Sequence, residues 1–66
     1  MLLSKRSILT GVMHEMDLNV TTDQLHRWQS GELIQNVMPH LSREEREFLI
    51  TGMSLEEQAE FFTLQE

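Results

Sequence analysis

The 66-residue sequence lacks cysteine and tyrosine, has a single proline and contains no long apolar run. Without cysteine, neither a disulfide nor a thiolate zinc site can stabilise the fold. No stretch approaches the roughly 20 apolar residues that span a bilayer, and the opening M-L-L-S-K-R lacks an apolar run of signal-peptide length. We therefore expect one small cytoplasmic domain held together by apolar burial and helix caps, with homodimer formation left open.

Positive charge is scarce as well. Five Lys and Arg residues oppose eleven Asp and Glu residues, which leaves a net charge of −6, and residues 42–66 hold most of it with seven acids and two arginines. Such a segment repels a phosphate backbone and could compete for a basic groove on another protein. The charge distribution therefore predicts a protein partner rather than a nucleic acid.

The motifs of catalysis and cofactor binding are missing. The sequence has no Gly-rich phosphate loop, no G-x-S-x-G elbow and no Ser/His/Asp ordering. His14, His26 and His40 lack metal-ligand spacing, so we expect His14 in the core and the other two on the surface. Capping and solvation explain the glutamates of the last third, namely Glu44, Glu45, Glu47, Glu56, Glu57 and Glu60. We expect no enzymatic activity, metal or cofactor.

Two helix-start signals stand twelve residues apart, with a glycine between them. Ser42 with Glu45 and Ser54 with Glu57 have the form of capping boxes. Gly52 can adopt the left-handed conformation that ends a helix. The pattern predicts two helices, each with one inward apolar stripe: Leu41, Phe48 and Leu49 on the first, and Leu55, Ala59 and Phe62 on the second.

A third capping box, Thr21 with Gln24, predicts a helix that begins near Thr22. A shorter helix is expected within residues 32–38, and it must end before Pro39. Around the intervening glycine this pair superficially resembles a helix-turn-helix, which leaves a DNA- or RNA-associated regulator as an alternative. The second helix, E-L-I-Q-N-V-M, has no Lys or Arg to meet phosphate or guanine.

Residues 12–20 alternate between apolar and polar side chains, as a half-buried strand does. A helical spacing also fits several of these residues, so a helix remains an alternative. The strand would pair with residues 5–9 through the Thr10-Gly11 turn, and its inner face would hold Val12, His14, Met16, Leu18 and Val20. We predict an α+β domain in which an N-terminal β-hairpin, residues 1–20, packs against three or four short helices in residues 21–66.

Residues 27–57, R-W-Q-S-G-E-L-I-Q-N-V-M-P-H-L-S-R-E-E-R-E-F-L-I-T-G-M-S-L-E-E, resemble a family of small uncharacterised proteins from bacteriophages and other mobile elements, and residues 5–11 do so more loosely. The resemblance implies the host cytoplasm as the location and carries no established activity. This chain has Leu55 and Gln58 where the family pattern has proline and tryptophan. That departure implies a variable, less firmly docked C-terminal helix.

The leading hypothesis is an accessory protein of phage type that binds a host or phage protein, in its sharper form as an inhibitor of a host nucleic-acid-binding enzyme. A small structural or scaffold protein is a further alternative. The candidate partner-binding residues are of types enriched at interfaces or belong to the acidic segment: Trp28, Arg27, Glu44, Glu45, Glu47 and Phe61.

Overall fold

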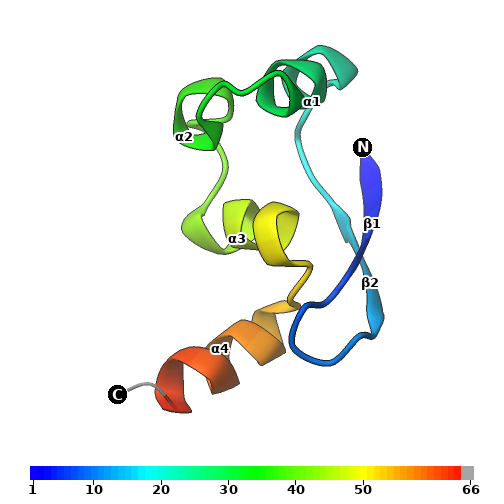
Figure 1. Ribbon diagram of the computed structural model, residues 1–66, viewed down its shortest axis with the longest axis vertical. Helices are drawn as coiled ribbons and strands as arrows, with labels where there is room; N and C mark the ends of the chain where they lie inside the picture. The colour runs from blue at the N-terminus through cyan, green and yellow to red at the C-terminus, as the bar shows by residue number, and fades with distance from the viewer. Residues whose placement is uncertain (65–66) are drawn as a thin grey trace.

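A computed structural model describes residues 1–64. The elements follow in the order β1 (Leu2–Arg6), β2 (Met13–Asp17), α1 (Thr22–Gln29), α2 (Ile34–Val37), α3 (Arg43–Thr51) and α4 (Leu55–Leu64). Figure 1 shows α1 and α2 at one end of the molecule, α4 at the other, and the hairpin running alongside α3. The predicted α+β class, with a hairpin followed by short helices, is confirmed. Within residues 1–64, no helix has the length and apolar character needed to cross a membrane.

The hairpin is antiparallel, and Ser4 stands opposite Glu15 at its centre. Exposed and half-buried residues alternate along both strands, as predicted for a sheet with one covered face. The strand ends differ from the prediction, because β1 stops at Arg6 and β2 begins at Met13. Val12 was expected on the inner face, and this was wrong: it lies in the loop with about half of its surface exposed.

The predicted helix starts are confirmed. Thr21 and Gln24 exchange both capping-box hydrogen bonds at the start of α1. Ser42 and Glu45 do the same for α3. The α2 helix is a single turn, and it ends before Pro39 as expected. A single turn is too short to act as the recognition helix of a helix-turn-helix.

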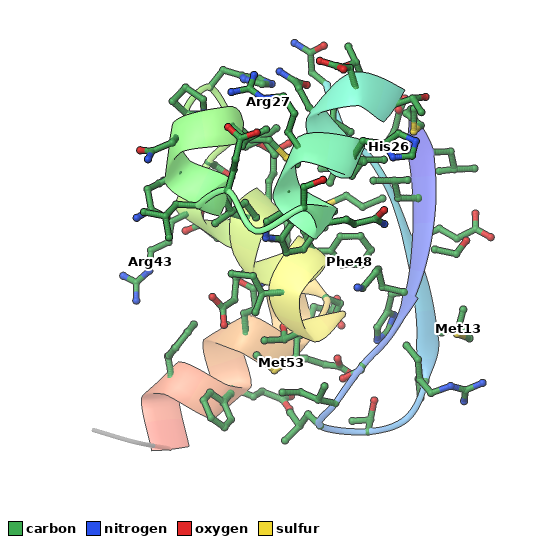
Figure 2. The ribbon with its side chains drawn as sticks, turned by 45° about the horizontal axis from the view of Figure 1, so that its top comes forward. Met13, His26, Arg27, Arg43, Phe48 and Met53 are labelled. Atoms are coloured by element: carbon green, nitrogen blue, oxygen red, sulfur yellow. The ribbon has the colours of Figure 1, made fainter. Side chains whose placement is uncertain are left out.

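The core lies between the hairpin, α2 and α3. Phe48 and Met38 are fully buried, and Figure 2 shows Phe48 on the side of α3 that faces the strands. The predicted inner stripe of α3 is thereby confirmed. The buried apolar residues are Leu18, Val20, Val37, Met38, Leu41, Phe48, Leu49 and Met53.

Gly52 joins α3 to the hairpin. Its φ of 76° places it in the left-handed region, as predicted for a helix stop. Its position serves a second purpose, because a Cβ atom there would lie 2.2 Å from the carbonyl oxygen of Arg6. The Ile8 amide then donates to the Thr51 carbonyl at 2.9 Å. The lack of a side chain is thus what allows α3 to end directly against β1.

The orientation of α4 differs from the prediction. Its stripe of Leu55, Ala59 and Phe62 was expected to face inward, yet Leu55 is 55% exposed and Ala59 is also exposed. Gln58 faces inward instead, 3% exposed, and its Nε2 donates to the carbonyls of Glu44 (3.0 Å) and Met53 (3.1 Å). These bonds attach α4 to α3 at Gln58, and the looser docking that the resemblance implies stays a prediction.

Candidate functional site

The candidate partner-binding residues outside the acidic segment lie at two ends of the molecule. Trp28 and Arg27 belong to α1, whereas Phe61 belongs to α4 at the opposite end (Figure 1). Trp28 is half-buried and packs against the core. Arg27 donates from Nε and Nη2 to the carboxylate of Glu32 at 3.0 and 2.8 Å. The structure therefore does not bring these residues together into one surface.

The acidic candidates lie on α3 in different surroundings. Glu45 closes the capping box through its Oε1, which accepts from the Ser42 amide at 2.9 Å. Among residues 1–64, the carboxylates of Glu44 and Glu47 have no hydrogen-bond or ion-pair partner. Glu44 is the more exposed of the two, and it borders α4. One of the three acids thus has a structural function, and two are available to a partner.

Phe61 and Phe62 form an aromatic pair near the end of α4. Their ring centroids lie 5.6 Å apart in an edge-to-face arrangement, and the Arg43 guanidinium lies 5.3 Å from the Phe62 centroid. Phe62 was expected in the inward stripe, and Phe61 was a candidate for partner binding. Both are half-buried, because α4 extends beyond the core that would have covered one of them.

A polar cluster joins the hairpin loop to the start of α4. Its centre is the carboxylate of Glu57, whose side chain is only 13% exposed. Oε2 accepts from the Thr10 hydroxyl at 2.6 Å and lies 3.0 Å from His14 Nε2, while Oε1 accepts from the Ser54 amide at 3.3 Å. Glu57 was expected on the outer face of its helix, and that was wrong. One carboxylate oxygen accepts from Ser54 within the capping box, and the other accepts from Thr10 of the hairpin loop.

Hydrogen bonding sets the protonation of this carboxylate. The pKa of Glu57 is lowered from 4.5 to about 2, chiefly by the bond from the Thr10 hydroxyl, and the nearby polar groups of Ser7, His14 and the Ser54 backbone act in the same direction, against the opposing effect of burial. Glu57 is therefore ionised throughout the neutral range. His14 was expected in the core. It lies on the inner face of β2, as the alternation predicted, but it is half-buried and not part of the core.

The cluster lacks the geometry of a nucleophilic relay. Such a relay places a histidine between a hydroxyl and a carboxylate, whereas here Glu57 is central and the Thr10 hydroxyl donates directly to it. Ser7 Oγ is buried and accepts from the amides of Leu9 and Thr10. Within residues 1–64, no group of three potential ligands gathers in the manner of a metal site. The arrangement is suited to fixing the loop against α4.

The Glu57 cluster predicts acid lability. Because the folded pKa, about 2, lies below the unfolded value of 4.5, the contribution of Glu57 is fully present above about pH 4.5 and is lost as the pH falls toward 2. Tm measured by circular dichroism should therefore fall over this window in the wild type and fall less in Glu57→Gln, which should also have a lower Tm at pH 7. Glu56→Gln, at an exposed neighbouring position, should keep the wild-type slope; equal slopes in all three proteins would contradict the assignment.

The hairpin loop and the first residue of β2 present apolar side chains to solvent next to this cluster. Ile8 is 76% exposed, Leu9 46%, Val12 52% and Met13 52%. Figure 2 shows Met13 pointing away from the helices. We call these four residues the hairpin loop surface. Sequence reasoning missed it because the loop was placed at Thr10-Gly11 alone; the signal was the apolar residues on both sides of that turn.

No known protein family, curated protein or solved structure matches the chain.

Proposed function

We propose that this protein is a small non-enzymatic accessory protein that acts by binding another protein through the hairpin loop surface. One observation carries the proposal: four large apolar side chains within six residues are about half or more exposed. Single exposed apolar residues are ordinary, whereas a contiguous group of them marks an interaction site. The sequence resemblance to phage and mobile-element proteins suggests a host or phage protein as the partner.

Hydrogen bonds hold this loop in one conformation. The Ser7 amide donates to the Val12 carbonyl at 2.9 Å, and the Gly11 amide donates to the Ser7 carbonyl at 2.9 Å. From outside the loop, Arg6 Nη1 donates to the Gly11 carbonyl at 2.8 Å. A loop ordered before binding loses less conformational entropy when it docks, so more of its apolar burial contributes to affinity. The geometry therefore favours a loop that inserts into an apolar recess of its partner.

Polar substitution of the loop should abolish partner binding without unfolding the protein. In Ile8→Ser/Val12→Ser we expect affinity for the partner to fall about tenfold or more, which corresponds to about 1.4 kcal/mol. The free energy of unfolding should change by no more than about 0.5 kcal/mol because both positions are exposed. The partner would first be captured from host and infected-cell lysates and then purified for calorimetric titration.

The matched control is Leu2→Ser/Leu33→Ser, which removes two equally exposed apolar side chains outside the loop. It should bind as the wild type does. The proposal fails if the loop variant binds with unchanged affinity, if only nucleic acid is recovered, or if the wild type binds lipid vesicles and no protein.

A further inference from the structure

A groove lies between the start of α3 and the exposed side of α4. It has a volume of about 300 Å³, and its lining comes from two residues of α3 and four of α4: Arg43, Glu44, Leu55, Gln58, Ala59 and Phe62. We call it the α3–α4 groove. The apolar stripe that the sequence analysis placed in the core thus borders this groove.

Gln58 keeps the groove open. Its two hydrogen bonds to the carbonyls of Glu44 and Met53 hold the inward side of α4 against α3. The buried amide must keep these partners, because an unsatisfied buried polar group costs free energy, and this fixes which side of α4 faces α3. Leu55 and Ala59 are consequently left exposed beside α3, and Phe62 is half-buried.

Carboxylates lie in and beside the groove. Glu56 and Glu60 follow Leu55 and Ala59 by one residue, about 100° around the helix, so they lie on the exposed side of α4 next to the groove. Glu44 lies on the α3 side. Within residues 1–64, none of these three acids has an ion-pair or hydrogen-bond partner through its carboxylate. Arg43, the cationic residue in the groove lining, lies over the Phe62 ring.

We infer that the α3–α4 groove binds an amphipathic helix of a partner protein, one whose apolar stripe is flanked by Lys or Arg. Helices dock in apolar grooves through side chains spaced three and four residues apart, and opposite charges along the rim set orientation and association rate. An apolar anchor would enter beside Leu55 and Phe62, and basic side chains would meet Glu56 and Glu60. This site is separate from the hairpin loop surface, so each proposal is tested by its own variants.

The test uses a fluorescein-labelled 14-residue peptide of leucine and lysine with the leucines on one helical face. Anisotropy titration of the full chain should show saturable binding that weakens as salt rises. Glu56→Lys/Glu60→Lys should weaken binding about tenfold or more, and Leu55→Ser should weaken it as well. Glu15→Lys/Asp23→Lys changes the net charge equally at exposed positions away from the groove, and it should bind as the wild type does. Circular dichroism would verify folding of each variant.

Amide chemical shifts in the peptide titration should change at Leu55, Ala59 and Phe62 and stay constant at Trp28 on the distant α1. A peptide with serine in place of leucine should not bind. The inference is overturned if both charge variants lose affinity equally, if the serine peptide binds as well as the leucine peptide, or if the wild type does not bind. It is also overturned if light scattering shows a dimer that Glu56→Lys/Glu60→Lys converts to a monomer, because a second copy would then occupy the groove.

Discussion

Alanine in place of Gly52 is expected to unfold most of the protein at 25 °C. A side chain at a φ of 76° costs about 1–2 kcal/mol by itself. The added Cβ would also lie 2.2 Å from the Arg6 carbonyl oxygen and 2.6 Å from the carbonyl carbon, so the hairpin and α3 must separate. Separation breaks the bond between the Ile8 amide and the Thr51 carbonyl. We expect a total loss of about 4 kcal/mol or more, which is large for a domain of this size.

Gly11→Ala measures the backbone part of this effect, so the difference between the two variants gives the steric part. Gly11 has nearly the same φ, 77°, but no atom lies within 4 Å of the position its Cβ would take. Its loss should be about 1–2 kcal/mol, from backbone conformation alone. Urea unfolding followed by circular dichroism would measure both variants. Equal losses at Gly52 and Gly11 would show that the close approach to Arg6 contributes nothing.

Truncation of Phe48 to alanine should be nearly as damaging. Phe48 is fully buried between α3 and the hairpin, and removal of such a side chain costs about 3–5 kcal/mol through lost apolar burial and the remaining cavity. A domain of 66 residues has little stability in reserve, so the variant should be largely unfolded at 37 °C. Thermal unfolding and the dispersion of the NMR spectrum would report this.

The control for Phe48 is Ile50→Ala on the same helix. Ile50 is 52% exposed, and alanine has the higher helix propensity, so its free energy of unfolding should stay within about 0.5 kcal/mol of the wild type. A comparable loss at Ile50 would mean that this exposed face of α3 is covered in solution.

Local structure could be predicted from the sequence where contacts between neighbouring residues determine it. Thr21 and Ser42 start helices because their hydroxyls accept from a backbone amide three residues later, and Gly52 ends one because it tolerates a positive φ. The alternation of β2 likewise predicted the face on which His14 lies. These features depend on contacts within a few residues, which a linear pattern contains.

Only part of the candidate site could be predicted from the sequence. The acidic character of α3 and α4 and the position of Glu44 followed from the sequence. The hairpin loop surface did not, because the exposure of Ile8 and Val12 depends on where the strand ladder stops, and that depends on the hydrogen bonds of Ser7 and on the docking of the loop against Thr51. Pairing across the loop is a property of the assembled hairpin.

By itself, the amino-acid sequence determined the order of the strands and helices, the helix caps and the apolar stripe of α3. Only the tertiary structure decided which side of α4 faces the core. The helical pattern predicted that Leu55 and Ala59 face inward. In the assembled molecule Glu57 and Gln58 face inward instead, because the Thr10 hydroxyl donates to the Glu57 carboxylate and the Glu44 carbonyl accepts from Gln58. A buried polar group is stable only where distant residues supply its partners, and those partners come together only when the chain is folded.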